Sequence, residues 1–560
     1  MSNGHLALLG DEAVALGAIH AGISAAYGYP GTPSTEILQY LIDEYEKGGA
    51  DFSSPVARWC SNEKTALEAG LGVSFAGRRS IITMKHVGLN VAADPFINAA
   101  LLGIKGGIVI AVADDPGMHS SQDEQDSRFY AAFAMVPCLE PRSQQEAYDM
   151  TREAFEVSER FQVPVLLRLS TRLSHARAAI SVKNAPASWK ESQKPLSKTT
   201  EKNRWMLLPA LARKNYVSLI EKQKEIREWS ASHPANKLEL PGKPGLPAKS
   251  GFSVITAGLG GNYYEENLAD LAVMRNGKPP RLHIGAYPLP EKLIRELCGV
   301  SEKVMVIEEG QPFIEEKLRG ILPQSVGILG RLGGVSDGNS IPRTGELDPD
   351  NVRSGLGLPP RPSAVVPGLD VASLPARPPQ LCKGCPHADS YEAIKKAVEE
   401  LDPRPGHPDV GINSDIGCYS LGAAPPYQVP ESIVCMGASV GMAKGAADAG
   451  LPYSVAVIGD STFIHSGITA LIDTVASDTP MTLIILDNSI VAMTGCQPTM
   501  VPSEKLRSLL LGCGVKPEHL LELEARKHLV EENAGKLKKE MEHRGLSVVV
   551  FKRECIQKRK

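Results

Sequence analysis

The first part of the chain alternates short apolar runs with polar segments. Residues 79–84, 108–113 and 163–169 are three such runs, and each is followed by polar residues. Strands buried on both faces of a parallel sheet have this continuous pattern, because helices cover both faces. The pattern therefore predicts repeated strand–helix units up to about residue 185. Ligands bind outside the carboxyl ends of such strands, so the polar residues after each run are candidates for a site or, equally, ordinary turn residues.

The same pattern returns in two later regions. Residues 253–257 and 304–307 predict strands of a small α/β unit, and its glycine turn at 258–261 favours a plain strand–turn–helix over a dinucleotide site. The predicted fold class is α/β, with several doubly wound parallel sheets. The predicted division is an α/β domain over 1–185, a charged linker or insertion over 186–250 with a helix near 214–230, an α/β domain over 251–340, a Pro-rich linker over 341–380, extended by its prolines, and a final α/β domain over 381–560.

Composition and charge exclude several classes of protein. Lys and Arg total 60 against 64 Asp and Glu, so there is no basic excess with which to bind nucleic acid. The N-terminus lacks the basic start of an export signal, and the most apolar stretch, 99–113, is interrupted by Lys105 and is too short to span a bilayer. We therefore expect no membrane contact and a cytoplasmic location.

The chain has ten cysteines, seven of them after residue 380. Without an export signal a disulfide framework is improbable, so this concentration points to metal or redox chemistry. Cys382 and Cys385 form a C-x-x-C pair, and Cys418 and Cys555 follow. Zinc, an iron–sulfur cluster and a redox dithiol are all compatible with the pair alone. Four thiolates drawn from scattered positions favour a cluster over a compact zinc knuckle.

Two predicted strand ends in the last domain suggest a cation site. Asp460 and Asn488 end apolar runs and stand 28 residues apart, which leaves room for one crossover helix between parallel strands. Both should then lie at the same edge of the sheet, where their oxygens and the backbone carbonyl of Ile490 suit Mg²⁺. Gly459 would let the backbone approach a diphosphate. The alternative is two ordinary strand-end loops.

These segments resemble a known family. Gly459–Ser461 with Asp487–Asn488 looks like a variant of the thiamine diphosphate motif, in which Ser461 and Asp487 depart from the usual Gly and Asn. Taken together, the motifs resemble the 2-oxoacid:ferredoxin oxidoreductases, specifically the alpha subunits of indolepyruvate ferredoxin oxidoreductases. The resemblance implies two thiamine diphosphate-binding-like domains and a transketolase C-terminal-like domain over 251–340. The matching segments are residues 29–36, 62–66, 83–90, 114–121, 382–387, 415–419, 435–441, 459–461 and 487–497.

The resemblance assigns roles to residues in the first domain. Glu63 matches the glutamate that contacts the aminopyrimidine of thiamine diphosphate, although a solvated helix carboxylate is its ordinary interpretation. Thr32 matches a threonine near the substrate. Lys85 and His86, at a predicted strand end, could neutralise a substrate carboxylate.

It also assigns roles in the last domain. Gly437 and Ser439 resemble a turn where a helix N-terminus receives phosphate. The remaining implied cofactor and metal residues are Gly459, Asp460, Ser461, Asn488, Ile490 and Thr494 around thiamine diphosphate and Mg²⁺, and Cys382, Cys385, Cys418 and Cys555 around one 4Fe–4S cluster.

The implied reaction is oxidative decarboxylation of a 2-oxoacid, an arylpyruvate such as indolepyruvate being favoured, to an acyl-coenzyme A. The implied partners are a smaller subunit, in a dimer of heterodimers for example, and ferredoxin or another electron carrier. The chain has no C-x-x-C-x-x-C run, so we expect electrons to leave from the single cluster to a separate carrier.

Two alternative functions, and four cysteines outside the proposed cluster, complete the predictions. A non-oxidative thiamine-dependent decarboxylase has no use for four thiolates, and a non-catalytic scaffold would not need Glu63, Asp460 and Asn488. Cys496 stands where the family pattern suggests Gly or His; we expect a small buried thiol rather than a pocket residue. Cys60, Cys138 and Cys298 are expected in the core.

Overall fold

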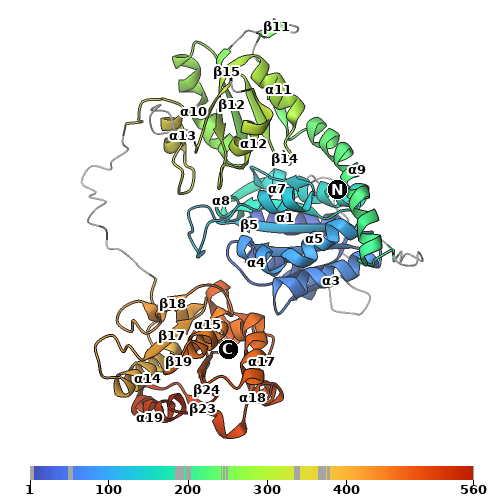
Figure 1. The fold of residues 1–560 in the computed structure, drawn as a ribbon. Coiled ribbons are helices and arrows are strands. Elements are labelled where there is room, and N and C mark those ends of the chain that lie inside the picture. Colours follow the sequence, from blue (N-terminus) through green and yellow to red (C-terminus); the bar gives the residue numbers. More distant parts are fainter. Residues whose placement is uncertain are drawn as a thin grey trace. The chain divides into compact units, whose positions relative to one another are not determined.

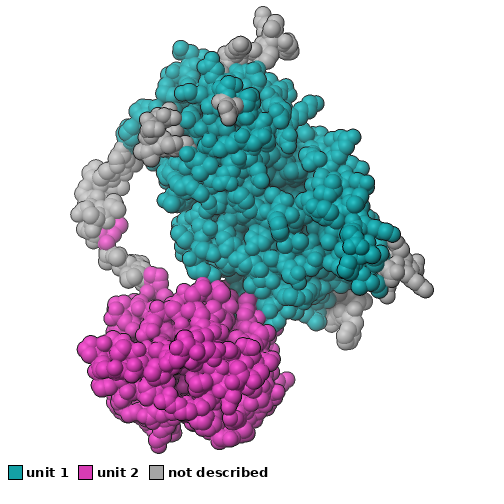
Figure 2. All heavy atoms as spheres, in the orientation of Figure 1, with its two compact units in different colours: residues 1–365 teal, residues 366–560 magenta. Residues whose placement is uncertain are grey.

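The computed structural model describes residues 5–47, 55–182, 195–196, 204–240, 242–243, 246–247, 250–323, 325–332, 341–362, 374 and 379–558. The chain forms two compact units, residues 1–365 and 366–560, which are coloured separately in Figure 2. In the described part, none of the helices combines the length and the apolar character that crossing a membrane requires.

The main sheet of unit 1 confirms the predicted parallel arrangement. Its seven strands have the order β14-β6-β7-β5-β4-β2-β3, and all neighbours are parallel except β14 with β6. The three apolar runs predicted first form β4, β5 and β7, in the centre of the sheet. The strands are β2 (Ile23–Gly28), β3 (Val56–Trp59), β4 (Arg79–Lys85), β5 (Ile108–Asp114), β6 (Cys138–Leu139), β7 (Val165–Ser170) and β14 (Ala286–Tyr287).

Helices cover this sheet on both faces, as a doubly wound fold requires (Figure 1). A short antiparallel pair, β1 (His5–Leu9) with β8 (Arg177–Ser181), lies beside it. The helices are α1 (Gly10–His20), α2 (Thr35–Lys47), α3 (Glu63–Phe75), α4 (His86–Val91), α5 (Ala93–Leu102), α6 (Arg128–Ala134), α7 (Gln144–Phe161) and α8 (Thr171–His175).

A second sheet of five strands completes unit 1, in the order β16-β15-β12-β13-β9. Only the edge strand β9 is antiparallel to its neighbour. The glycine turn at 258–261 leads from β12 directly into α10, as the plain strand–turn–helix interpretation predicts. The elements are β9 (Lys237–Glu239), β10 (Gly242–Lys243), β11 (Leu246–Pro247), β12 (Ser250–Ala257), α10 (Gly260–Met274), β13 (Arg281–Ile284), α11 (Glu291–Gly299), β15 (Ser301–Ile307), α12 (Phe313–Ile321), β16 (Gly327–Leu329) and α13 (Pro349–Gly355).

The two predicted linkers differ from the structure in part. The helix expected near 214–230 is present as α9 (Pro209–Ser232), and it buries Ile226 and Trp229. Residues 183–194 and 197–203 of the first linker lie outside the described residues. The second linker begins too early at 341, because α13 folds there and buries Val352 and Leu356 in the core of unit 1. Residues 363–373 and 375–378 of that linker are not described.

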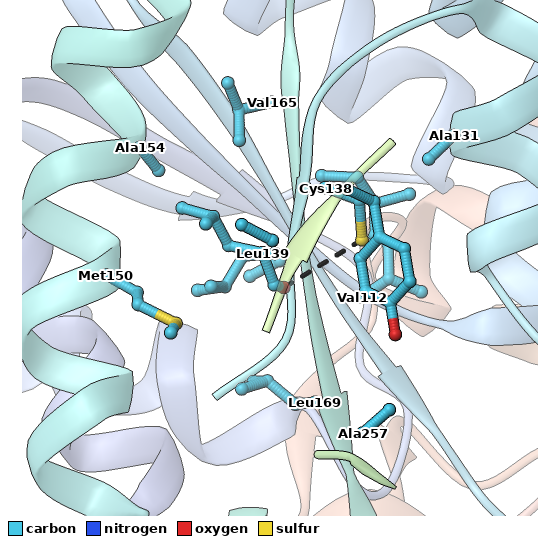
Figure 3. Close-up of a cluster of buried hydrophobic side chains, with 14 of the residues drawn as sticks. Val112, Ala131, Cys138, Leu139, Met150, Ala154, Val165, Leu169 and Ala257 are labelled. Atoms are coloured by element: carbon cyan, nitrogen blue, oxygen red, sulfur yellow. Dashed lines mark hydrogen bonds between the residues drawn. The ribbon is translucent and has the colours of Figure 1, made fainter. Parts of the chain in front are cut away.

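The core of unit 1 lies between the main sheet and its helices. Figure 3 shows Cys138 and Leu139 of β6 among side chains of β5, β7 and α7. Cys138 has no exposed surface and Cys298 only 7%, which confirms both as core residues. Cys60 is only half-buried, but it packs against the same core.

One buried acid in unit 1 gives a stability prediction. Asp11, in the first turn of α1, is fully buried, and neither carboxylate oxygen makes a hydrogen bond. Burial raises the pKa of Asp11 to about 8, and the negative charge of Glu36 adds to the shift. The unfolded chain releases this proton near pH 4, so folding becomes less favourable as pH rises from about 4 to about 8.

The variant Asp11→Asn should remove this pH dependence. At about pH 9 we expect the variant to melt at a higher temperature than the native chain, and its free energy of unfolding to be larger by at most about 5 kcal/mol. At about pH 4 we expect little difference in stability between the two. Thermal unfolding across this range measures the difference. Asp43→Asn, at an exposed carboxylate on α2, is the control. A native pH profile in the Asp11→Asn variant would contradict the assignment.

Unit 2 is built on one six-stranded, all-parallel sheet with the order β18-β17-β19-β20-β24-β23. Separate apolar clusters pack on its two faces, so it is also doubly wound. The described elements are α14 (Pro386–Leu401), β17 (Val410–Ser414), η3 (Cys418–Ala423), β18 (Ser432–Ile433), α15 (Ala438–Asp448), β19 (Tyr453–Gly459), α16 (Asp460–Thr462), the π-helix η4 (Phe463–Gly467), α17 (Ile468–Ser477), β20 (Thr482–Asp487), β21 (Ile490–Val491), η5 (Ala492–Thr494), β22 (Gln497–Pro498), α18 (Ser503–Gly512), η6 (Pro517–His519), β23 (Leu520–Glu524), η7 (Lys527–Leu529), α19 (Val530–Met541) and β24 (Ser547–Lys552).

Candidate functional site

Asp460, Asp487 and Asn488 lie together at the carboxyl ends of β19 and β20 in unit 2. The strands are neighbours, with Gly459 opposite Leu486, so the residues that follow them meet at one edge. The backbone N–H of Ser489 donates to Asp460 Oδ2 at 3.0 Å and to Asp487 Oδ1 at 3.1 Å. The sequence prediction that Asp460 and Asn488 share an edge is therefore met by the geometry.

Asp460 and Asp487 form a buried pair of carboxyl groups. They are 6% and 3% exposed, and burial together with the charge of Asp487 raises the pKa of Asp460 well above its ordinary value. Asp487 Oδ2 has no hydrogen-bond partner, and within the described residues neither group pairs with a Lys or Arg. Adjacent buried carboxylates are costly unless a cation compensates them, so the pair suits a hard divalent ion. In the sequence, Asp487 was noted only as a departure from the thiamine diphosphate motif.

Asn488 is held by contacts on both ends of its amide. Its Oδ1 accepts from the Ile490 N–H at 3.3 Å, and its Nδ2 lies 3.2 Å from His387 Nε2. Burial and the nearby Arg553 lower the pKa of His387 to about 4, so the ring is neutral and can accept this hydrogen bond. His387, which sequence reasoning did not select, thereby fixes which way the Asn488 oxygen faces.

The other predicted cofactor residues surround this edge. The Ser461 N–H donates to Asp460 Oδ1 at 2.9 Å. Ile490 begins the short hairpin of β21 and β22, and Thr494, at its turn, donates to Gln497 Oε1 at 2.7 Å.

Two glycines in this region are required by packing and backbone conformation, whereas the sequence predicted roles beside a diphosphate. A Cβ on Gly459 would lie 2.5 Å from the ring of Tyr419, so packing of this ring already requires glycine there. Gly437 has φ +87°, and its close approach to Ser466 leaves no room for a side chain. The N-terminus of α15, expected to receive phosphate, is occupied instead by Asp415, whose carboxylate accepts hydrogen bonds from the N–H and hydroxyl of Ser439.

The four predicted cluster cysteines gather near the same edge. Cys382 and Cys385 form a turn before α14, with the Cys385 N–H bonded to the Cys382 carbonyl at 3.0 Å. The Cys555 N–H donates to the carbonyl of Asn488 at 3.0 Å. Burial, together with the charges of Cys385, Cys555, Cys382 and Cys496, raises the pKa of Cys418 to about 12, so these thiols lie near one another.

Their spacing argues against a single zinc ion. Within the described residues, no three His, Cys, Asp or Glu side chains lie close enough to hold one metal ion. Four thiolates on one zinc approach within about 4 Å of one another, because each Zn–S bond is about 2.3 Å long, so these side chains are not arranged for a single zinc ion.

Cys496 corrects an expectation. It is half-exposed rather than buried, and it lines a cavity of about 1150 Å³ together with Asp487 and Ile490. Its Sγ lies 3.8 Å from the Gln557 carbonyl, and the Gln557 N–H donates to Cys555 Sγ at 3.4 Å. Cys496 is therefore a pocket residue beside the cysteine group.

In unit 1, the predicted residues also share one sheet edge. Thr32 follows β2, Glu63 follows β3, and Lys85 and His86 stand at the end of β4. Lys85 Nζ donates to the Ser120 carbonyl at 2.9 Å, and the Ser120 hydroxyl donates to the Thr32 carbonyl at 3.3 Å. Burial lowers the pKa of Lys85, and the negative charges of nearby acids, Glu63 among them, partly oppose this shift.

Glu63 is not the solvated carboxylate of the ordinary interpretation. It is 6% exposed at the start of α3, where Asn62 caps the helix by accepting from the Thr65 N–H at 2.9 Å. A Cβ on Gly88 would lie 2.5 Å from Glu63 Oε1, so this carboxylate packs directly against the backbone of α4. A buried carboxyl group at a sheet edge can bond a heteroatom of a ligand.

Asp115 is a further residue of this edge. It follows β5 and accepts from the Ser120 N–H at 2.8 Å, the Ser121 hydroxyl at 2.6 Å and the Thr171 hydroxyl at 2.6 Å. It therefore holds the loop that positions Lys85 and Thr32. Its place directly after a buried strand was the available signal in the sequence.

Comparison with known families identifies the class of protein. The model of the pyruvate flavodoxin/ferredoxin oxidoreductase thiamine diphosphate-binding domain matches residues 16–235. The model of the C-terminal TPP-binding domain of thiamine pyrophosphate enzymes matches residues 415–551. These matches contain the two sheet edges described above. The chain is a thiamine diphosphate-dependent 2-oxoacid oxidoreductase.

Full-length relatives then give the family. The chain is 37% identical to indolepyruvate oxidoreductase subunit IorA of Archaeoglobus fulgidus, over 98% of this chain and 86% of the relative. It is 35% identical to the subunit of the same name from Methanothermobacter thermautotrophicus, over 98% and 87%. The chain belongs to the indolepyruvate oxidoreductase subunit IorA family. Among solved structures, 2-oxoglutarate:ferredoxin oxidoreductase from Magnetococcus marinus aligns at 17% identity and a TM-score of 0.47, covering 58% of this chain and 62% of that one.

Proposed function

We propose that this chain oxidatively decarboxylates an arylpyruvate such as indolepyruvate to an acyl-coenzyme A, and that electrons leave through one 4Fe–4S cluster. The observation that carries the proposal is the hydrogen bond from Cys555 to the Asn488 carbonyl. It joins the four-cysteine group to the buried acidic pair that suits a metal-bound diphosphate. A 2-oxoacid oxidoreductase needs this proximity, because electrons released beside the diphosphate cofactor must reach an acceptor.

The residues of unit 2 fit the diphosphate and its cation. Asp460, Asn488 and the Ile490 carbonyl would hold Mg²⁺, which would neutralise the charge of a diphosphate. Asp487 would add negative charge beside the ion, and its oxygen without a hydrogen bond supports this role. Ser461 and Thr494 would line the same site. Bound thiamine diphosphate supplies a nucleophilic carbon and an electron sink for decarboxylation.

The residues of unit 1 would act on an aminopyrimidine ring and on the substrate. Glu63 would bond a ring nitrogen of the aminopyrimidine and hold a proton there. Its burial favours this, because a hydrogen bond made away from water is stronger. Lys85 and His86 would neutralise the substrate carboxylate, and Thr32 would border it.

The proposal includes partners. The relatives are named as subunits, so we propose a smaller partner subunit in a hetero-oligomer such as a dimer of heterodimers, with coenzyme A as co-substrate and ferredoxin or another carrier as acceptor. The expected location is the cytoplasm. A non-oxidative decarboxylase is the second candidate function, but the gathered thiols of Cys382, Cys385, Cys418 and Cys555 favour the oxidative reaction.

Turnover of a panel of 2-oxoacids tests the proposal. The chain is assayed without oxygen, with its partner subunit, Mg²⁺ and thiamine diphosphate, and a viologen dye as electron acceptor. We expect dye reduction that requires both the 2-oxoacid and coenzyme A, with kcat/KM for arylpyruvates roughly tenfold or more above that for pyruvate. Release of aldehyde without dye reduction would establish the decarboxylase instead. Equal rates with pyruvate would overturn the substrate assignment.

A further inference from the structure

A polar cavity in unit 1 lies away from the sheet edge that carries Glu63 and Lys85. It has a volume of about 420 Å³ and is bordered by the end of α5, by Gln162 after α7 and by α9, which packs along α5 (Figure 1). This volume falls in the usual range for small-molecule sites. Three cations, Arg204, Lys214 and Lys222, line the cavity, and none of the described residues lining it is acidic.

Two of the three cations are partly withdrawn from water. Lys222 and Arg204 are half-buried, whereas Lys214, on the same face of α9 as the core residue Leu219, is exposed. A helix normally turns lysines to water, so the position of Lys222 is the exception. Burial lowers the pKa of Lys222, and the nearby charge of Arg204 lowers it further. Within the described residues, none of the three forms an ion pair.

Arg204 is held in place before any ligand arrives. Its Nη1 donates to the Leu102 carbonyl at 2.7 Å, and its guanidinium lies 4.6 Å from the ring centre of Trp205. Trp205 in turn stacks on Phe75 at 4.2 Å. Gly103, with φ +75°, leaves room for the guanidinium, because a Cβ there would lie 3.0 Å from Nη2. A fixed guanidinium beside two lysines is an arrangement that recognises phosphate.

We propose that this cavity binds a small molecule carrying a diphosphate group. Two or three negative charges would compensate Arg204, Lys214 and Lys222, which otherwise repel one another. Ser218 and Asn215, which also line the cavity, would donate further hydrogen bonds. The cavity is separate from the sheet edge that carries Glu63 and Lys85, since Leu102, Gly103 and Gln162 precede β5 and β7, whereas that edge lies where the strands end.

Calorimetric titration of the full chain with ADP, inorganic diphosphate and adenosine tests the proposal. The Asp460→Ala variant without Mg²⁺ serves as background, so that the proposed thiamine diphosphate site does not contribute. We expect saturable binding of ADP and of inorganic diphosphate, and none of adenosine. Lys214→Gln and Lys222→Gln should each weaken binding by about tenfold, since each removes a charge-assisted contact. Lys224→Gln, on the same helix but outside the cavity, should leave the affinity unchanged.

A second readout separates binding from folding. Because Lys222→Gln removes repulsion with Arg204, the ligand-free variant should melt at or above the native temperature while it binds more weakly. A lower melting temperature together with unchanged affinity would reduce Lys222 to a structural residue and overturn the proposal. Absence of saturable binding, or binding of adenosine as tight as that of ADP, would also overturn it. None of these outcomes depends on whether the chain oxidises 2-oxoacids.

Discussion

Asp460→Ala is expected to abolish retention of thiamine diphosphate. The variant removes one of the two buried carboxylates at the ends of β19 and β20, and with it a ligand to the proposed Mg²⁺. We expect the affinity for thiamine diphosphate in the presence of Mg²⁺ to fall roughly 100-fold or more, since even outer-shell partners of a metal contribute up to that factor. Titration calorimetry, and thiamine diphosphate content after desalting, measure the loss.

The stability of the variant distinguishes a lost ligand from a damaged fold. In the ligand-free chain, Asp460 and Asp487 oppose each other without a hydrogen bond to Asp487 Oδ2, so removing one should not lower the melting temperature. Asp473→Ala is the matched control, because this carboxylate of α17 is 72% exposed. Full retention of thiamine diphosphate by the Asp460→Ala variant would exclude the proposed Mg²⁺ site. A large drop in melting temperature would instead assign Asp460 a structural role.

The positions of the site residues could be predicted where they depend on local pattern. Continuous apolar runs identified β4, β5, β7, β19 and β20, and parallel strands must place the residues that follow them at one edge. This reasoning brought Asp460 and Asn488 together, and it selected Lys85 and His86. The same rule could have selected Asp115, which follows β5 directly.

What the sequence could not predict depends on long-range contacts. Arg128 and Arg168 are both fully buried and share Asp126 and Glu140, with Glu308 reaching the cluster from the second sheet. No local pattern indicates that two arginines enter the core. Such a cluster is stable only when every member is paired.

Glycine and proline patterns were also ambiguous. Gly459 fits a diphosphate approach and a packed Tyr419 ring equally well in sequence, and only the structure shows the ring. The Pro-rich stretch after residue 340 favoured an extended linker. Yet Asp348 caps α13 by accepting from the Asn351 N–H at 2.7 Å, with Pro349 in the first turn, where proline is tolerated.

Cys385→Ser is the variant expected to separate the two proposed cofactors. Cys385 is the most buried of the four cysteines. Water therefore cannot readily take the place of its sulfur as a ligand to the proposed cluster. We expect the native chain, purified without oxygen, to be brown, with broad absorption near 400 nm and about four iron atoms per chain. The serine variant should lose the colour and nearly all of the iron, and with it dye reduction.

Binding of thiamine diphosphate should survive in the same variant. Asp460 and Asp487 are fixed by the Ser489 N–H, which does not depend on the thiols, so their geometry should persist. Cys435→Ser is the matched control, since this thiol of unit 2 is exposed and is not among the charges that act on Cys418. Iron retained by the Cys385→Ser variant, or lost equally by the Cys435→Ser control, would contradict the assigned ligands. Loss of thiamine diphosphate together with iron would show that the four cysteines and their cluster stabilise the sheet edge that carries Asp460 and Asn488. The hydrogen bond from the Cys555 N–H to the Asn488 carbonyl would explain that effect.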